Sequence, residues 1–207
     1  MDALDLLEWK RRIIELYAEI RSASDPAEAW LVWREVRDDL FRLHPQSPLP
    51  AQARAGFRGV QYFPYDRQLR VLADVESADP EFLEIAGSAG SAVRFARFGR
   101  AGFELPGEWR SLELYWLEGY GGGIFVPFGD ETNGGDSYGP GRYVLDSVKG
   151  ADLGTEDGRL VLDFNFAYNP SCSYDPRWAC PLCPSANRLL IPIRAGERIA
   201  SPPIAPA

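Results

Sequence analysis

Residues 92–117 read AVRFARFGRAGFELPGEWRSLELYWL, in which short apolar or aromatic runs alternate with charged residues and are interrupted by Gly and Pro. This pattern predicts short β-strands separated by turns. It continues through the rest of the chain after Pro50. The predicted strands are Gln68–Val75, Glu81–Ile85, Ala92–Arg97, Gly102–Leu105, Ser111–Leu117, Ile124–Pro127, Arg142–Leu145, Leu160–Phe164 and Leu189–Ile193. About nine closely spaced strands without intervening helices favour an antiparallel meander that closes into a β-barrel or a sandwich.

In the first fifty residues the spacing of the apolar residues is different. Apolar residues recur every three or four positions between Asp2 and Ile20, which predicts an amphipathic helix. A second helix is predicted to begin at Asp25, whose side chain can cap the first turn, with Pro26 at the first helical position. Its apolar positions run from Trp30 to Phe41, and His44-Pro45 ends it. The two helices predict a hairpin packed on a mainly β (α+β) fold.

The length of 207 residues suits a single hydrophobic core, so we expect one folding unit. In this interpretation residues 1–50 form the helical hairpin and residues 51–200 form the antiparallel β domain. Residues 201–207 contain three prolines, and this tail is predicted to be disordered.

The chain is acidic, with 22 Lys and Arg residues against 30 Asp and Glu residues and a formal net charge of −8. We expect no nucleic-acid partner, because phosphate binding requires a basic surface. We also expect no membrane partner, since no apolar run is long enough to cross a bilayer. The N-terminus has no pattern of an export signal, so the predicted location is the cytoplasm.

A first polar segment covers residues 125–143, which read FVPFGDETNGGDSYGPGRY between two predicted strands. Asp130 and Tyr138 are candidates for acid–base chemistry, and Thr132 is a candidate binding group. Arg142 could bind a carboxylate or phosphate with both arms of its guanidinium. The alternative is a long hairpin loop in which Gly, Asn and Asp serve only the turn geometry.

A second polar segment covers residues 160–184, which read LVLDFNFAYNPSCSYDPRWACPLCP. Strand alternation would place Asp163 and Asn165 on the face opposite Phe164 and Phe166. The polar face then looks outward if the aromatic face is core, or into a pocket if the strand lines one. The Asn-Pro, Asp-Pro and Cys-Pro steps that follow predict a loop of fixed shape, which could form the wall of a site.

The three cysteines fall within twelve residues of each other. Cys180 and Cys183 have the C-x₂-C spacing of a zinc knuckle, and Cys172 is a third candidate ligand. A fourth ligand could come from His44, Asp175 or water. The alternatives are structural thiols or a catalytic thiolate, because an odd number of cysteines argues against a disulfide scaffold. A catalytic triad would have to use His44, whose place at a helix end is more typical of a cap.

Many short segments together resemble the bacterial and archaeal family called domain of unknown function 1684. The matching segments are Ser47–Leu49, Gly59–Asp66, Phe125–Phe128, Asp130, Thr132, Gly134, Tyr138-Gly139, Gly141–Tyr143, Leu162–Asn165, Ala167–Pro170, Cys172, Tyr174, Cys180-Pro181, Asn187 and Ala195–Glu197.

The resemblance covers nearly the whole chain and implies a fold unit without naming an activity. The features it implies to be shared by the family are Asp130, Arg142, Asp163, Asn165, Tyr168, Asn169, Cys172 and Cys180. Cys183 departs from the family pattern, which weakens the case for a zinc site that the whole family shares.

We therefore expect an enzyme that acts on a small polar or anionic molecule by acid–base chemistry, with the two polar segments meeting over one pocket. The predicted catalytic residues are Asp163, Asp130, Tyr138 and Tyr168, and the predicted substrate-binding residues are Arg142, Asn165, Asn169 and Thr132. The alternative is a ligand-binding or accessory module without catalysis, stabilised by zinc if Cys172, Cys180 and Cys183 bind it. No nucleotide-binding fingerprint or nucleophile elbow occurs, so no nucleotide cofactor is expected.

Overall fold

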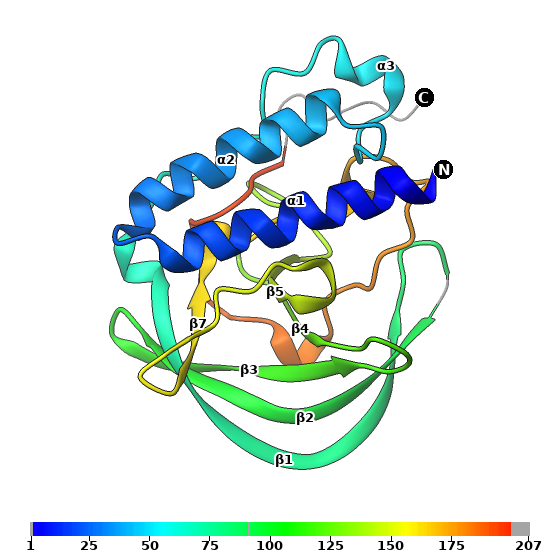
Figure 1. The fold of residues 1–207 in the computed structure, drawn as a ribbon. Helices are drawn as coiled ribbons and strands as arrows, with labels where there is room; N and C mark the ends of the chain where they lie inside the picture. Colours follow the sequence, from blue (N-terminus) through cyan, green and yellow to red (C-terminus); the bar gives the residue numbers. More distant parts are fainter. Residues whose placement is uncertain (1, 91, 200–207) are drawn as a thin grey trace.

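The computed structural model describes residues 2–90 and 92–199, and it shows a pair of helices packed on a curved antiparallel sheet (Figure 1). The helices are α1 (Ala3–Ser22), α2 (Pro26–Leu43) and the short α3 (Ala51–Arg54). The strands are β1 (Arg70–Ala86), β2 (Ala92–Leu105), β3 (Glu108–Leu117), β4 (Ile124–Phe128), β5 (Arg142–Asp146), β6 (Thr155–Glu156) and β7 (Arg159–Asp163). Their order in the sheet is β5-β4-β3-β2-β1-β7-β6.

The predicted α+β class with an N-terminal helical hairpin is confirmed, and the sheet is not closed into a barrel. Both helices begin at aspartate caps, since Asp2 accepts a hydrogen bond from the Leu4 amide and Asp25 accepts one from the Ala27 amide. No helix among the described residues is both long and apolar enough to cross a membrane. The predicted disordered tail, residues 201–207, lies outside the described residues.

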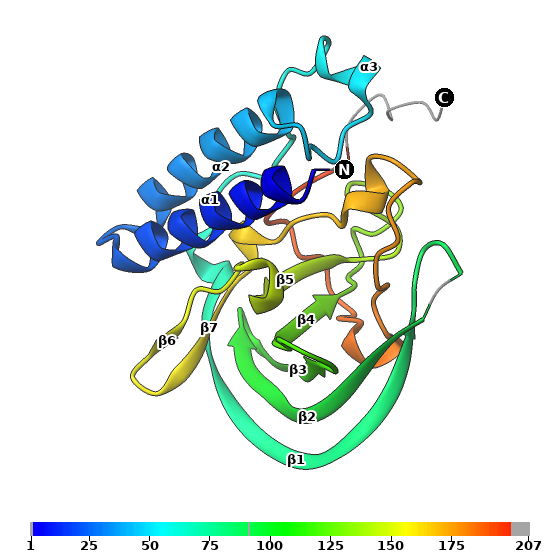
Figure 2. The same ribbon diagram turned by 45° about the vertical axis from the view of Figure 1, so that its right-hand side comes forward.

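Strands β1 and β2 are long and bend into a trough, as Figure 2 shows. The sequence predicted a break in each, but both breaks are irregularities inside a continuous strand. Pro80 lies between Ser77 and Glu81, where the register of the β1–β2 pairing shifts. Because Pro80 is not paired with β2, its missing N–H costs the sheet no hydrogen bond. A Cβ at Gly99 would lie 2.6 Å from the Glu76 carbonyl oxygen, so glycine lets β2 continue against β1 at this close approach.

The predicted strand Leu189–Ile193 is wrong, because this stretch belongs to no strand. Several of its backbone groups bond to loops and side chains instead. The Leu189 amide donates to the Gly129 carbonyl, and the Ile193 amide and carbonyl bond to the side chains of Asp130 and Arg142. Leu189 and Ile193 are thus buried without a strand partner, while Leu190 between them is exposed.

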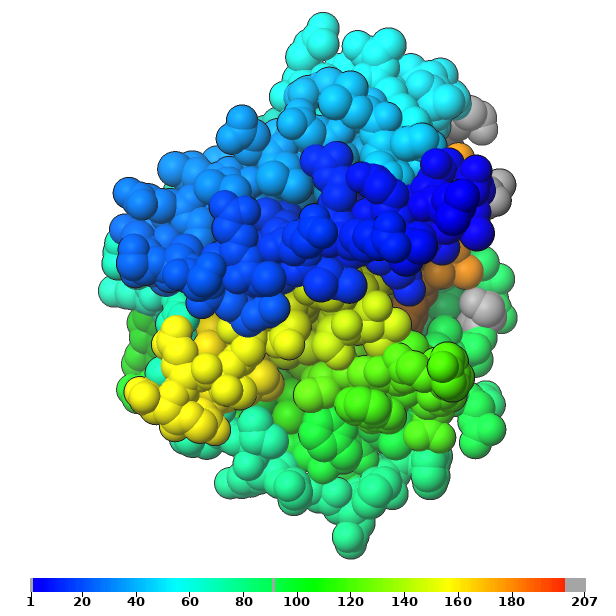
Figure 3. All heavy atoms as spheres, viewed as in Figure 1, coloured from blue at the N-terminus to red at the C-terminus, as the bar shows by residue number. Residues whose placement is uncertain are grey.

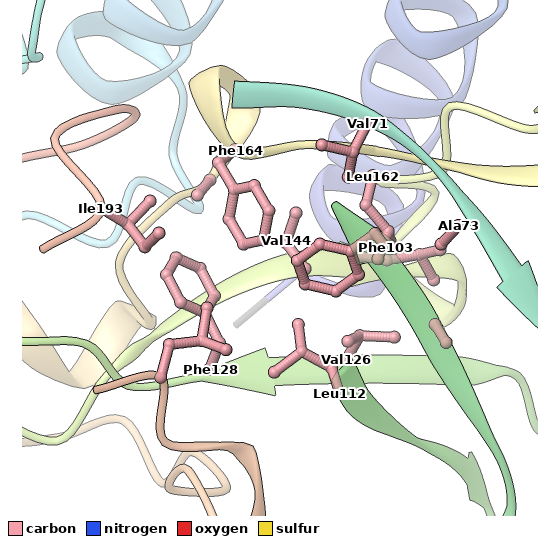
Figure 4. Packing of buried hydrophobic residues seen from close by; sticks show 14 of the residues in the cluster. Val71, Ala73, Phe103, Leu112, Val126, Phe128, Val144, Leu162, Phe164 and Ile193 are labelled. Carbon is pink, nitrogen blue, oxygen red and sulfur yellow. The ribbon is translucent and has the colours of Figure 1, made fainter. Parts of the chain in front are cut away.

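Two large apolar clusters and a small one, formed by Phe41, Leu49 and Val60, make up the core. One fills the trough of the sheet, where Phe103, Phe128 and Phe164 meet (Figure 4). The second lies between the sheet and the helices and includes Trp30 and Trp33 of α2. In Figure 3, α1 lies directly beside the part of the chain that contains β6 and the turn after β5. The helical hairpin is therefore needed to bury the upper side of the β domain.

Candidate functional site

Arg142, at the start of β5, is fully buried and bonded to the protein on both guanidinium arms. Its Nη2 atom lies 2.8 Å from Asp130 Oδ2 and donates to the Ile193 carbonyl at 2.9 Å. Its Nη1 atom donates to the carbonyls of Ala195 and Glu197. Arg142 therefore ties the C-terminal segment to β5, and it does not present a free fork to a ligand.

Asp130 and Thr132 belong to the same internal network. Asp130 Oδ1 accepts hydrogen bonds from the amides of Thr132 and Ile193 at 2.7 and 3.2 Å. The Thr132 hydroxyl pairs with the Ser137 hydroxyl across the loop. This part of the first polar segment consequently matches the hairpin-loop interpretation, since its polar groups satisfy one another and the backbone.

Asp163 caps a short 3-10 turn at the end of β7. Its Oδ1 atom accepts from both the backbone amide and the side-chain amide of Asn165, while Oδ2 lies 3.4 Å from the Tyr65 hydroxyl. Burial raises the pKa of Asp163 to about 6, although the bonds from Asn165 oppose this rise. Asp163 also lines a pocket of about 270 Å³ together with Arg70 and Glu156.

Asn165 joins this turn to the chain before β1. Its side-chain oxygen accepts from the Asp66 amide, and its side-chain nitrogen donates to the Asp66 carbonyl, both at 2.8 Å. The predicted alternation ends here, because residues 164–166 form the 3-10 turn and Phe164 and Phe166 enter different core clusters. Asn165 is thus a structural clamp, and its side chain is fully occupied.

The two polar segments meet, but their side chains divide among separate environments. Tyr143 and Tyr168 exchange both backbone hydrogen bonds, which joins β5 to the chain after β7. Arg142 and Asp130 face the C-terminal segment, whereas Asp163 faces Tyr65 and the pocket beside Arg70. Arg142 is absent from the lining of that pocket, so the two groups do not act on a shared ligand there.

A different pair of adjoining pockets lies under α1, where residues of both helices meet the second polar segment. The inner pocket has a volume of about 70 Å³ and the outer pocket about 230 Å³. Trp9, Pro48, Lys149 and Ser171 line both of them. The other residues of the inner pocket are Ile13, Tyr17, Arg37, Phe41, Ala151, Tyr168, Asn169 and Tyr174.

Two polar atoms of the inner pocket have no protein partner. Asn169 Oδ1 and the Tyr174 hydroxyl are buried, and neither has a hydrogen-bond partner among the described residues. Such an atom loses its hydration without compensation, unless a water or a ligand occupies the pocket. Of the predicted site residues, only Asn169 and Tyr168 line this pocket.

Charged side chains surround the same pocket. Arg37 is buried, and its Nη2 atom pairs with Glu197 Oε2 at 3.1 Å, while its Nε atom donates to the Tyr62 hydroxyl. Burial raises the pKa of Glu197 to about 7, even though the positive charge of Arg37 opposes the rise. Lys149 is half exposed at the rim of the pocket, and its Nζ atom lies 3.6 Å from Asp146 Oδ2.

The sequence did not identify Arg37, Lys149 or the role of Glu197 in this pocket. One signal was present for Arg37, because it lies four positions after Trp33 and thus on the buried stripe of α2. A charged residue on such a stripe must find a buried partner. That partner, Glu197, is 160 residues away in the chain, and no local pattern could indicate it.

The cysteines divide into a pair and a separate thiol. The thiols of Cys172 and Cys180 interact directly, and the Tyr138 hydroxyl lies 3.6 Å from Cys172 Sγ. Cys183 lies apart from them and bonds to the carbonyls of Pro184 and Asn187.

The predicted zinc ligands are not grouped as a metal site. Across residues 2–90 and 92–199, no three His, Cys, Asp or Glu side chains are placed to hold a metal ion. The candidate fourth ligand, His44, uses its ring nitrogens to contact Glu8 and the Gln46 amide.

Comparison with known proteins places the chain in a family. A family model described as "Protein of unknown function (DUF1684)" matches residues 55–198. The chain belongs to the DUF1684 family. The matched residues include all strands of the sheet and the chain after β7, which forms part of the pocket walls. Helices α1 and α2 precede the matched residues.

A solved structure is similar over most of the DUF1684 chain. It is the solution NMR structure of an uncharacterized protein of Haloarcula marismortui, with 36% sequence identity and a TM-score of 0.59. The similarity covers 81% of this chain and 91% of that chain. No curated protein matches the sequence significantly. The similarity supports the fold and assigns no activity.

Proposed function

We propose that this DUF1684 protein binds a small anionic molecule in the adjoining pockets under α1. The observation that carries the proposal is that Asn169 and Tyr174 line the inner pocket beside a buried arginine, and that Asn169 Oδ1 and the Tyr174 hydroxyl have no hydrogen-bond partner among the described residues. Buried polar atoms in native proteins are usually hydrogen bonded, and a ligand can supply the missing bonds.

The lining specifies the chemistry of this ligand. Asn169 Oδ1 requires a donor such as a hydroxyl or an amine, and the Tyr174 hydroxyl can donate or accept. Lys149 at the rim favours a carboxylate or a phosphate. Trp9 and Phe41 offer aromatic surface to an apolar part of the molecule. The best match is a small hydroxy or amino acid, or a compact phosphate monoester.

A second candidate is an acid–base enzyme that uses the same pocket. It is favoured by Glu197, whose pKa of about 7 suits proton transfer near neutral pH and whose Oε1 atom has no partner among the described residues. Tyr168 could donate a hydrogen bond to the substrate, because burial raises the pKa of its hydroxyl well above the usual value and keeps it protonated. Binding is the better supported function, since Glu197 lies behind Arg37 and outside the pocket lining.

Isothermal titration calorimetry with short hydroxy acids, amino acids and phosphate monoesters tests the proposal. We expect binding of an anionic compound and no binding of its uncharged amide. Lys149→Gln should weaken binding about tenfold, because one charge-assisted hydrogen bond is worth roughly 1.5 kcal/mol. Arg194→Gln is the control, since Arg194 pairs with Asp136 on an exposed surface.

Two results would contradict the proposal. The first is the absence of heat and of thermal stabilisation with every anionic compound. The second is binding that Lys149→Gln and Tyr174→Phe leave unchanged. NMR spectra recorded over time with a bound compound separate the two candidates, because only an enzyme converts it.

A further inference from the structure

We propose that Cys172 and Cys180 are a redox-responsive pair, which a peroxide converts into an intramolecular disulfide. The proposal concerns a covalent modification and does not require that the ligand proposed above binds. It rests on the position of the two thiols, on the access to them and on the contrast with Cys183.

Both cysteines lie in one loop that the chain holds in place from two sides. Cys172 is in the 3-10 turn Ser171–Ser173, and its sulfur lies 3.6 Å from the Tyr138 hydroxyl. The backbone of Cys180 exchanges hydrogen bonds with Ser88, because its amide donates to Ser88 Oγ and its carbonyl accepts from the Ser88 amide. These contacts hold both ends of the loop, and the two thiols are near enough for each to shift the pKa of the other.

Access to the pair is provided by the outer pocket. Cys180 lines this pocket of about 230 Å³ beside Trp178 and Ala179. Cys172 is half-buried, and most residues between the two cysteines are half-buried or exposed. A molecule as small as hydrogen peroxide can therefore reach the thiols.

The surroundings select Cys172 as the nucleophile. The Cys180 thiol donates a hydrogen bond that lowers the pKa of Cys172, and Ser88 and Tyr138 add to this effect. The thiolate form of a cysteine reacts with peroxides. The same interaction raises the pKa of Cys180, which keeps its proton until the second step.

The reaction balances with one molecule of hydrogen peroxide. The thiolate of Cys172 attacks one peroxide oxygen, so that a sulfur–oxygen bond forms, the oxygen–oxygen bond breaks and hydroxide leaves. The resulting sulfenic acid is attacked by the sulfur of Cys180, which forms the disulfide and displaces the hydroxyl. Together with the protons of the two thiols, the two oxygens leave as water, and the two sulfurs lose one electron each.

Cys183 provides an internal comparison. It lies next to Gly129 and Gly141, away from the pair, and its thiol donates to the Pro184 carbonyl at 3.3 Å. Burial raises the pKa of Cys183 to about 12, so it holds almost no thiolate near neutral pH. The structure thus predicts that only two of the three thiols respond to peroxide.

Peptide mapping of the peroxide-treated full-length chain tests this proposal directly. Trypsin cleaves after Arg177, so Cys172 and Cys180 fall in different fragments, residues 160–177 and 178–188. We expect the two fragments to be joined without reductant and separated with it, in a chain that stays monomeric on a non-reducing gel. Fragment-ion spectra of the joined peptides identify the linked sulfurs in the wild-type protein.

Variants then distinguish the cysteines that share a fragment. The joined peptides should form in Cys183→Ser and be absent in Cys180→Ser. Iodoacetamide at mildly acidic pH should label Cys172 at least roughly tenfold faster than Cys183. The proposal is overturned if Cys172 links to Cys183, if the link joins two chains, or if peroxide gives only sulfinic acid at Cys172.

Discussion

Arg142 Nη2 and Asp130 Oδ2 form an ion pair at 2.8 Å in which both side chains are completely excluded from solvent. The same guanidinium donates hydrogen bonds to three backbone carbonyls, those of Ile193, Ala195 and Glu197. A buried charge is tolerated only when it is paired and hydrogen bonded, so each partner depends on the other. This pair fastens the C-terminal segment to the β4–β5 hairpin.

Replacement of Arg142 with methionine should therefore destabilise the protein strongly. Arg142→Met leaves Asp130 charged in the interior and the three carbonyls without a donor, and breaking such a pair costs about 3–5 kcal/mol. Urea unfolding measures the loss. Arg194→Met is the matched control, because Arg194 and Asp136 are largely exposed and their pair is worth less than about 1 kcal/mol. Equal losses in the two variants would contradict the assigned role.

This pair also illustrates what the sequence could and could not predict. The hairpin brings Asp130 and Arg142 together, as their position in one loop between two strands suggested. The sequence predicted substrate chemistry for both residues, and that role stays a prediction. The groups that occupy Arg142 in the structure come from residues 193–197, about fifty positions later. Local spacing contains no information on such distant partners.

The fold was predictable where local physics decides it. Asp25 and Pro26 start α2 as expected, since capping depends on neighbouring residues alone. The interruptions at Pro80 and Gly99 were misread as strand ends, because the same residues serve turns and bulges. Only the partner strand decides between the two, and the sequence does not show which strand that is.

Gly141 should not tolerate a side chain. Its φ angle is +104°, and a Cβ would lie 2.6 Å from the Phe128 carbonyl oxygen and 2.8 Å from Cys183 Cβ. Gly134 has a similar positive φ of +82° but open space around it. Gly134→Ala should therefore lower the free energy of unfolding by about 1–2 kcal/mol through backbone strain alone. Gly141→Ala should lower it clearly more, because steric overlap adds to the strain.

Urea unfolding of the two variants isolates the steric contribution at Gly141, because both replace a glycine of the same loop. A loss for Gly141→Ala that does not exceed the loss for Gly134→Ala would show that the loop can move away from β4. In that case Gly141 would serve the turn geometry alone.

Tyr174→Phe should leave the free energy of unfolding unchanged or raise it slightly. The hydroxyl is buried without a partner among the described residues, so its removal relieves a desolvation penalty and keeps the ring contact with Phe41. Most substitutions at a packed position are destabilising, so the expected sign is unusual. The control is Tyr17→Phe, which removes a hydroxyl that accepts from Trp33 Nε1 at 3.1 Å and should cost about 1 kcal/mol.

The stability of the protein should fall as the pH rises from mildly acidic to neutral. Burial raises the pKa of Glu197 from 4.5 to about 7 and that of Asp163 from 3.8 to about 6. The folded state therefore holds both protons more firmly than the unfolded chain. Their stabilising contribution is complete below the unfolded values and is lost as the pH passes through the folded ones.

Glu197→Gln tests this sign, because glutamine stays uncharged throughout and can still accept from the Asn169 amide, as Glu197 Oε2 does at 2.7 Å. Urea unfolding at constant ionic strength should show that the wild type loses up to about 3 kcal/mol between about pH 5 and about pH 7.5. The variant should lose markedly less, whereas Glu131→Gln at an exposed position should follow the wild type. A wild-type stability that rises over this range would mean that Arg37 holds Glu197 ionised, and the buried carboxyl would then be a permanent half of an ion pair.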